Sequence, residues 1–153
     1  MIEMFKGIFR SFGYAFQGIF RTILEERNFR IHIVAVCLVT WFSFLYEVTV
    51  GQAIVLVILF GIVLSLELVN TAIENVVDLA TAEFHPLAKK AKDASAGAVL
   101  VSAIVSVLVA VFMFRDSEHW SFFLKKITTP LGIVFLIIFV LLAMFFVRGK
   151  SRK

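Results

Sequence analysis

The chain has 153 residues, 61% of them hydrophobic, and its mean hydropathy is +0.98. Soluble domains average about 45–50% apolar residues, so this composition excludes an ordinary soluble globule and indicates a membrane protein of one domain. The formal net charge of +4 is modest. It favours no nucleic-acid partner, and it makes the placement of the charges more informative than their sum.

Residues 1–30 predict an amphipathic interfacial helix. Apolar side chains recur at helical spacing on one side, and basic or amide side chains gather on the other. The apolar set is Phe5, Ile8, Phe9, Phe12, Phe16, Ile19, Phe20 and Ile23, and the polar set is Lys6, Arg10, Gln17 and Arg21. A basic helix with an aromatic apolar face lies along a membrane surface rather than across the membrane.

Four apolar segments follow, each close to the length of about 20 residues that crosses a hydrocarbon core. They are residues 31–50, 51–72, 95–114 and 127–147. The second helix is expected to continue into water over residues 73–84, until Pro86 breaks it. His85, beside this proline, is typical of a loop or capping residue. Small residues in the third segment, Ser95 and Ala103 among them, would permit close packing against another helix.

This pattern predicts an all-α, multi-pass membrane helical bundle with four parts. Residues 1–30 are the surface helix, and residues 31–114 are a core of three spans. Residues 115–126 are a polar external connection, and residues 127–153 add a fourth transmembrane helix with a basic cytoplasmic tail.

The basic residues predict the orientation of the bundle. Twelve belong to the N-terminal segment, the loop between the second and third spans, and the tail: Lys6, Arg10, Arg21, Arg27, Arg30, Lys89, Lys90, Lys92, Arg148, Lys150, Arg152 and Lys153. The opposite side holds Arg115, Lys125 and Lys126. Short loops rich in Lys and Arg stay in the cytoplasm, so the larger set is expected on that side.

The segment E-L-V-N-T-A-I-E-N-V-V-D at 67–78 places polar residues on one face of the second span. Offsets of 3, 7 and 11 residues from Glu67 put Asn70, Glu74 and Asp78 near one side of a helix. Glu67 lies near the membrane boundary, and Glu74 lies about 10 Å further out. A carboxylate at the bilayer centre costs at least about 2.5–3.5 kcal/mol, so intramembrane acids are functional candidates. A polar face that only packs helices is the alternative, strongest for Asp78 and Glu83.

Two further sets of charges would complete a kit for phosphoryl transfer. Glu25 and Glu26 precede the first span at the expected depth of Glu74, and one carboxylate from each segment could bracket a divalent cation such as Mg²⁺. The lysines of residues 89–92 could balance phosphate charge. A solvated acidic pair and ordinary positive flanking are the simpler interpretations. The sequence has no P-loop or protein-kinase motif, so ATP use would follow another design.

These residues and their spacing resemble the signature of the prokaryotic diacylglycerol kinase family, which includes undecaprenol kinases. The resemblance rests on the 67–78 segment, on A-E-F-H at 82–85 and on A-K-D-A-S-A-G-A-V at 91–99. G-Y-A-F-Q-G at 13–18 and E-R-N-F-R-I-H at 26–32 extend it to about residues 5–114. The 26–32 motif looks more like the undecaprenol kinase branch than the diacylglycerol branch.

The resemblance implies a kinase of the bacterial plasma membrane that phosphorylates a lipid alcohol with ATP and Mg²⁺. It implies a homotrimer with active sites between subunits, open to the cytoplasm, and direct in-line transfer. Glu67 would be the general base, and Asn70 would orient groups beside it. Glu26 and Glu74 would hold the metal and the nucleotide phosphates. The further nucleotide contacts implied are Tyr14, Glu83, His85, Lys92 and Asp93.

The chain departs from the family pattern in three places. Gly7 stands where the family has an arginine, and its neighbours Lys6 and Arg10 are possible replacements. Ala96 stands where a serine is common, with Ser95 beside it. The fourth span extends beyond the usual family length, and its expected role is packing around the trimer or anchoring the tail.

Undecaprenol, converted to undecaprenyl phosphate, is the expected lipid substrate, and diacylglycerol, converted to phosphatidic acid, is the alternative. Two non-kinase functions are also compatible with the pattern. One is a proton or ion transporter that uses Glu67 and Asn70, for which we expect ion flux in vesicles without lipid phosphorylation. The other is a passive scaffold protein, in which the polar face of the second span is incidental.

Overall fold

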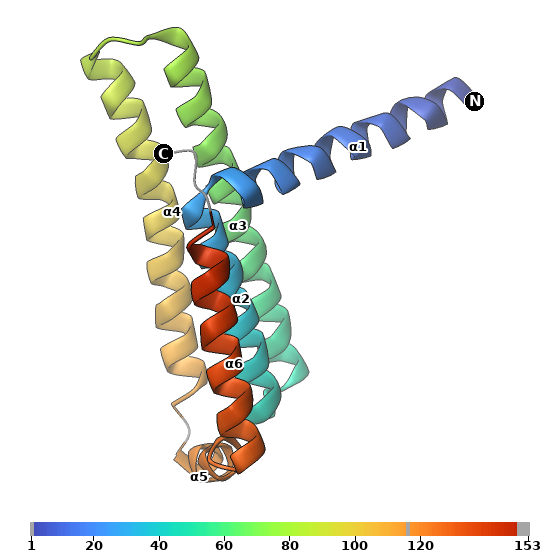
Figure 1. The fold of residues 1–153 in the computed structure, drawn as a ribbon, viewed down its shortest axis with the longest axis vertical. Helices are drawn as coiled ribbons and strands as arrows, with labels where there is room; N and C mark the ends of the chain where they lie inside the picture. Colours follow the sequence, from blue (N-terminus) through green and yellow to red (C-terminus); the bar gives the residue numbers. More distant parts are fainter. Residues whose placement is uncertain (1, 116, 150–153) are drawn as a thin grey trace.

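This computed structural model describes residues 2–115 and 117–149. The described residues form six helices joined by short connections (Figure 1). They are α1 (Ile2–Glu25), α2 (Arg27–Tyr46), α3 (Val50–Ala80), α4 (Pro86–Met113), α5 (Ser117–Ile127) and α6 (Pro130–Val147). Helices α2, α3, α4 and α6 run alongside one another as a bundle, α1 projects from it, and α5 lies at one end. Those four bundle helices are long and apolar enough to cross a membrane. The predicted all-α, multi-pass bundle is confirmed.

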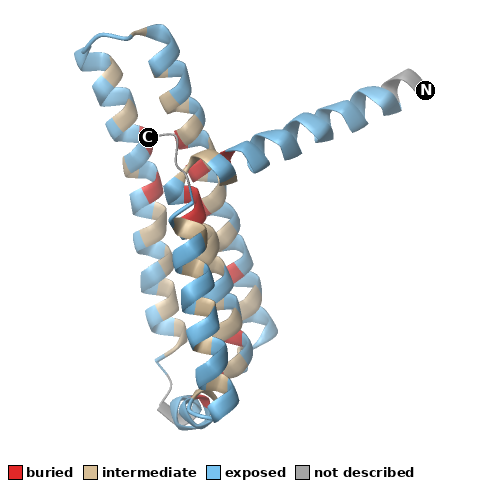
Figure 2. Cartoon of the chain, viewed as in Figure 1, coloured by how far each residue is buried: buried red, intermediate tan, exposed pale blue. Residues whose placement is uncertain are grey.

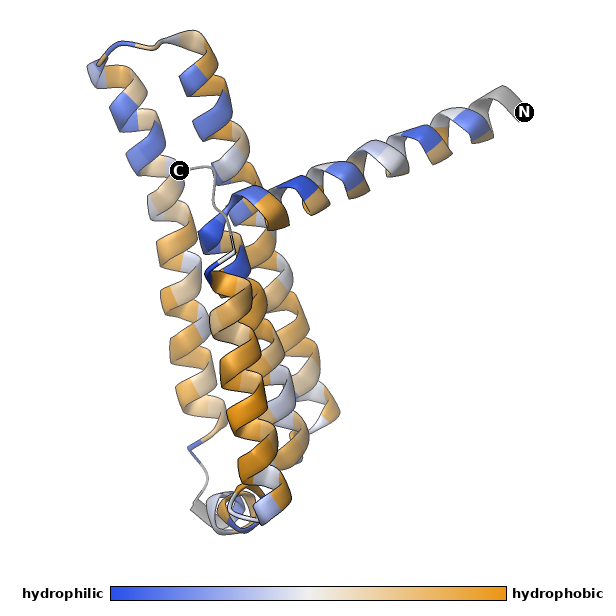
Figure 3. Ribbon diagram, in the orientation of Figure 1, coloured by the Kyte–Doolittle hydropathy of each residue, from blue (hydrophilic) through white to orange (hydrophobic). Residues whose placement is uncertain are grey.

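Helices α3 and α4 form a hairpin that is longer than a membrane is thick. They have 31 and 28 residues, whereas about 20 cross the hydrocarbon core. Their extra turns reach past α2 and α6 (Figure 1), and along this extension the ribbon changes from mainly apolar to mainly polar (Figure 3). As the sequence predicts, α3 therefore continues without a break from the apolar zone into water.

The turn of this hairpin differs from the prediction. Helix α3 ends at Ala80 rather than near residue 84, and Thr81 after it has an extended backbone. Pro86 does not end α3 but begins α4, because proline fits the first turn of a helix and holds the preceding residue in an extended conformation. His85 Nδ1 accepts a hydrogen bond from the Leu87 N–H at 3.2 Å, which confirms its capping role.

The segment after α4 contains a helix that the sequence analysis did not predict. Most of the polar connection at residues 115–126 is helix α5, and the fourth span, α6, begins at Pro130 rather than at 127. Aromatic rings join α5 to α2, with ring centroids 4.3 Å apart for Phe42 and Phe123. Lys126 Nζ lies 2.8 Å from Glu47 Oε1 at the C-terminal end of α2. The connection is therefore a helix packed against the end of α2, rather than an extended loop.

The bundle is apolar outside and partly polar inside. Few side chains are buried, as Figure 2 shows. The buried polar or charged residues are Thr22, Arg30, Ser43, Glu67, Asn70 and Ser95. Many large apolar side chains of α3, α4 and α6 face outward, as hydrocarbon requires. Inward ionisable groups in a membrane protein are expensive and mark functional positions, so buried Glu67, with buried Asn70 and Ser95 nearby, indicates where the candidate site lies.

The described basic residues keep the predicted separation along the bundle. The corner between α1 and α2 lies at the same end as the C-terminus of α6, because Arg30 Nη2 donates a hydrogen bond to the Gly149 carbonyl at 2.9 Å. Lys126 lies at the opposite end, against Glu47. The tail residues Lys150, Arg152 and Lys153 fall outside the described residues. The assignment of the first end to the cytoplasm stays a prediction.

We expect Phe42→Ala to destabilise the protein by about 3 kcal/mol, the lower end of the range for removing a packed phenylalanine. The Phe42 ring contacts those of Tyr46, Phe114, Trp120 and Phe123. Thermal unfolding in detergent, followed by tryptophan fluorescence, measures the change. Phe44→Ala is the matched control, because Phe44 is 81% exposed. Equal destabilisation by both substitutions would contradict a specific role for the ring cluster.

Candidate active site

The centre of the candidate site is the carboxylate of Glu67 on α3. The Glu67 side chain is ionisable, and the residue is only 3% exposed. It lies on α3, a mainly apolar helix that is long enough to cross a membrane. Glu74 and Glu26 are close enough to Glu67 to interact with it electrostatically. The structure therefore brings together the three acids that the sequence analysis assigned to proton transfer and metal binding.

A polar ladder leads from this centre toward the end of the hairpin. Ser95 Oγ on α4 donates a hydrogen bond to Asn70 Oδ1 at 2.7 Å, and Asn70 Nδ2 donates one to Glu74 Oε1 at 3.1 Å. Asn70 and Ser95 are both buried. Because the amide oxygen faces Ser95, the amide nitrogen must face Glu74. Asn70 thus orients a carboxylate one turn away, as expected for polar residues four apart on a helix.

Glu26 occupies the corner between the surface helix and the first span. It is the single residue between α1 and α2 and has an extended backbone, φ −103° and ψ 117°. Its N–H donates to the Thr22 carbonyl at 2.8 Å, and its carbonyl accepts from the Arg30 N–H at 3.4 Å. Its side chain makes no capping hydrogen bond. The main chain of Glu26 is therefore held from both helices, while its carboxylate is not used to cap α2.

The acids suit a metal site that phosphate oxygens and water complete, rather than one formed by protein side chains alone. Within residues 2–115 and 117–149, no group of three or more His, Cys, Asp or Glu side chains is arranged to hold a metal ion. Mg²⁺, however, usually takes only one or two carboxylates, with phosphate oxygens and water completing its shell. Glu26 and Glu74 have the carboxylate chemistry for such an incomplete set, and each lies close enough to Glu67 to interact with it electrostatically.

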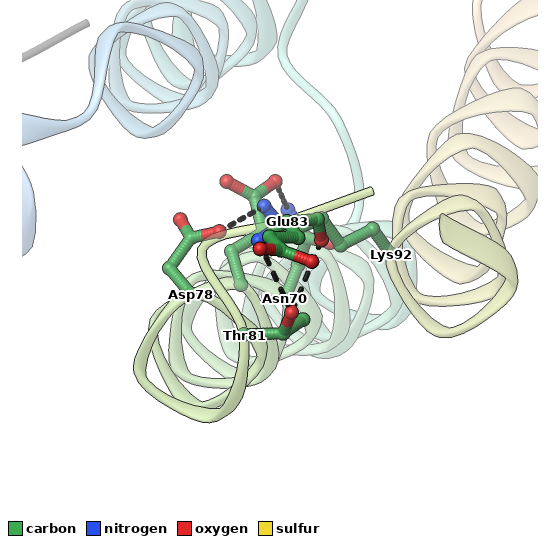
Figure 4. A network of polar contacts seen from close by, with 6 residues as sticks. Asn70, Asp78, Thr81, Glu83 and Lys92 are labelled. Carbon is green, nitrogen blue, oxygen red and sulfur yellow. Dashed lines mark hydrogen bonds and ion pairs between the residues drawn. The ribbon is translucent and has the colours of Figure 1, made fainter. Parts of the chain in front are cut away.

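The turn between α3 and α4 forms a hollow of about 450 Å³. Its lining includes Glu83, His85, Lys92 and Asp93, four of the residues for which the family resemblance implies nucleotide contacts. Lys92 Nζ forms an ion pair with Asp78 across the hairpin. Thr81 Oγ1 and the main chain of Glu83 exchange hydrogen bonds at 3.1 and 3.2 Å. Figure 4 shows these contacts with Asn70, so the hollow and the ladder share one side of the hairpin.

Tyr14 is not brought to the other predicted site residues within one chain. It is 65% exposed on α1, which projects away from the hairpin (Figure 1). It lines a separate hollow with Gln17, Arg21 and Glu25. Gly7 lies further out on the same helix.

The sequence analysis missed two residues of this region. Ser95 was named as a small packing residue and as the neighbour of Ala96, but its hydrogen bond to Asn70 was not predicted. Arg30 was counted only as a charge for orientation, although it is buried and hydrogen bonded at the α1–α2 corner. The available signal was the 91–99 motif, which puts Ser95 three residues after Lys92 and therefore on the same side of α4.

Comparisons with known proteins agree with the resemblance. Residues 13–114 match the family of prokaryotic diacylglycerol kinases. The chain is 47% identical over 106 residues to an undecaprenol kinase of Bacillus subtilis, across 69% of this chain and 86% of that protein. It is 46% identical over 101 residues to a diacylglycerol kinase of Synechocystis sp., across 65% of this chain and 57% of that protein. A diacylglycerol kinase of Escherichia coli K12 is 34% identical over 104 residues, which are 68% of this chain and 85% of that protein.

We expect a double-mutant cycle of Ser95→Ala and Asn70→Ala to give a coupling energy of about 1 kcal/mol, typical of one buried hydrogen bond. Unfolding of the single and double variants in detergent measures it. The control cycle pairs Asn70→Ala with Ser102→Ala, because Ser102 donates to the Val99 carbonyl of its own helix instead. Equal coupling in both cycles would argue against a specific Ser95–Asn70 contact.

Proposed function

The chain belongs to the prokaryotic diacylglycerol kinase family, and from this premise we propose that it transfers the γ-phosphoryl group of ATP to the hydroxyl group of a membrane lipid. The observation that carries the proposal is the polar ladder of Ser95, Asn70 and Glu74, which begins one turn of α3 beyond buried Glu67 and leads toward the turn of the α3–α4 hairpin. A lipid kinase must serve one substrate confined to the membrane boundary and one confined to water. The two ends of this ladder suit those two substrates.

Glu67 is the proposed general base. Its burial at the membrane boundary suits contact with a lipid hydroxyl, which stays at that depth. In the transfer step the lipid oxygen forms a bond to the γ-phosphorus while the bond from that phosphorus to the bridging oxygen of ADP breaks. The hydroxyl proton passes to the Glu67 carboxylate, and ADP departs. No covalent intermediate with the protein is needed, because positioning and charge stabilisation supply most of the catalysis.

The polar residues beyond Glu67 are proposed to bind Mg·ATP. Glu26 and Glu74 would share the metal, with Asn70 holding Glu74 in place. The bound Mg²⁺ supplies charge neutralisation on the phosphate oxygens. Lys92 and Asp93 line the hollow of the hairpin with Glu83 and His85, and this set would contact the nucleotide.

Undecaprenol is the proposed lipid substrate. Support comes from the 47% identity to the undecaprenol kinase of Bacillus subtilis and from the E-R-N-F-R-I-H motif at 26–32. Diacylglycerol is a second candidate, favoured by the relatives that are named diacylglycerol kinases. Both lipids offer a primary hydroxyl beside apolar chains, so the proposed phosphoryl transfer is the same for either.

A homotrimer with active sites between subunits is proposed for the working enzyme, with those sites at the cytoplasmic face. The exposure of Tyr14 on a projecting helix supports the first part, since only a neighbouring subunit would bring this residue to a hairpin. The excess of basic residues in the N-terminal segment, the α3–α4 turn and the tail supports the cytoplasmic placement of the sites. Residues 1–30 and 31–114 would supply the site, and residues 115–153 would lie outside it.

Exchanging each acid for its amide separates the proposed roles. We expect Glu67→Gln to lower kcat by at least about 100-fold, the usual contribution of a general base, while ATP binding is retained. Glu74→Gln should instead raise the KM for Mg·ATP. Steady-state kinetics and nucleotide-binding measurements on both variants provide the data. Glu25→Gln makes the same charge change nearby and should keep near-parental kinetics. Equal loss of nucleotide binding in the Glu67 and Glu74 variants would refute this division of roles.

Labelled ATP identifies the lipid. The purified protein is given undecaprenol and diacylglycerol in identical mixed micelles, and label in the organic phase is measured for each. We expect faster labelling of undecaprenol. Faster labelling of diacylglycerol would overturn the choice of lipid but keep the kinase, whereas label in neither lipid would overturn the proposed function.

A further inference from the structure

Arg30 is a buried cation whose partners are all main-chain carbonyls. Arg30 is 3% exposed, and its guanidinium donates three hydrogen bonds. Nη1 donates to the carbonyls of Ile23 and Leu24 at 3.1 and 2.9 Å, and Nη2 donates to the carbonyl of Gly149 at 2.9 Å. Burying a charge is costly unless it is hydrogen bonded, so these carbonyls determine where the guanidinium rests.

The three carbonyls come from segments far apart in the sequence. Ile23 and Leu24 belong to the last turn of α1, where helix carbonyls lack intrahelical partners and carry partial negative charge. Gly149 follows the end of α6, 119 positions along the chain from Arg30. Arg30 itself belongs to the first turn of α2. One side chain therefore joins the surface helix, the first span and the fourth span.

The corner that Arg30 closes is the one that presents Glu26. The Glu26 N–H is bonded to α1 through Thr22, and its carbonyl is bonded to the main chain of Arg30. Any change in the angle between α1 and α2 must therefore move Glu26. The Nε of Arg30 is buried without a partner among the described residues. An unpaired buried N–H is unfavourable, so the three hydrogen bonds of Nη1 and Nη2 must hold the guanidinium at the corner.

We propose that α6 and Arg30 act together to position Glu26. Helix α6 delivers the Gly149 carbonyl, which adds a third acceptor to the two from α1 around Arg30 and fixes the angle between α1 and α2. Arg30 is then a positioning residue, which acts on the substrate only through Glu26. The inference rests on the proposed function, because it takes Glu26 to be a ligand for Mg·ATP.

The packing of α6 supports this role. Its Phe135 and Phe139 rings lie 5.1 and 6.4 Å from the ring of Trp41 on α2. These contacts set the height of α6 along α2, and hence the height at which Gly149 meets Arg30. Helix α6 contributes no residue to the ladder or to the hollow, and it lies beyond the residues 13–114 that match the family. Its connection to the site runs through Arg30.

Two substitutions in the full-length protein test the proposal from opposite sides. Arg30→Lys keeps the charge but has one nitrogen, which cannot reach both α1 and Gly149. Trp41→Ala leaves Arg30 intact and loosens α6 instead. We expect each to raise the KM for Mg·ATP about five- to tenfold and to leave the KM for the lipid within about twofold. The matched controls are Arg148→Gln, an exposed arginine beside Gly149, and Phe44→Ala, an exposed aromatic residue of α2. Both should keep parental kinetics.

A second measurement follows the corner without activity. Spin labels at Phe12→Cys on α1 and Val101→Cys on α4, with Cys37→Ser and dilution by unlabelled protein, report the direction of α1. We expect one narrow distance in the parent and in Arg148→Gln, and a broad distribution in Trp41→Ala and Arg30→Lys.

The outcomes separate this inference from the proposed function. A parent protein without lipid kinase activity refutes the proposed function, and the spin-label distances still test the corner. An active parent whose Arg30→Lys and Trp41→Ala variants keep the parental KM for Mg·ATP refutes the inference alone. The inference is also overturned if Arg30→Lys yields less folded protein but the folded fraction keeps the parental KM for Mg·ATP, because Arg30 would then contribute only to stability. If Arg30→Lys does not fold, Trp41→Ala decides.

Discussion

The burial of one carboxylate at the border between hydrocarbon and water is the constraint on which the rest of the structure depends. Glu67 is withdrawn from solvent on a helix whose first turns are almost entirely apolar, and such a placement is unfavourable unless polar groups accompany it. Ser95, Asn70 and Glu74 form a hydrogen-bonded polar set on α3 and α4 that begins one turn of α3 from Glu67. Their contacts require α3 and α4 to approach closely, which the small residues of α4 permit.

The uninterrupted helix α3 relates the two ends of the site by fixed geometry. From Val50 to Ala80 there is no break, so Glu67 and Glu74 stay about 10 Å apart along the axis, at about 1.5 Å per residue. A lipid hydroxyl and a triphosphate can each remain in their own solvent while one rigid element contacts both. Rigid placement is what a reaction that depends on alignment requires.

The sequence predicts the features of this protein that are local to one helix. The shared face of Glu67, Asn70 and Glu74 follows from their spacing, and the spans follow from runs of apolar residues. The contact between Ser95 and Asn70 depends on how α3 slides against α4, and periodicity within each helix leaves that register open. Helix α5 was not predicted, for a different reason. Its segment is polar on average, and this obscures the spacing of Trp120 and Phe123.

The burial of Arg30 could not be predicted, because it depends on a contact between its guanidinium and the main chain at the end of α6, which the number of spans alone does not specify. A chain that ended at residue 114, where the family match stops, would place its C-terminus at the opposite end of the bundle from the α1–α2 corner. Adding α6 makes the number of apolar spans even and returns the chain to the α1–α2 corner. Only then does the Gly149 carbonyl become available to accept a hydrogen bond from Arg30 Nη2. A helix that carries no polar site residue can in this way act on the site, because its direction decides which end of the bundle its last residues reach.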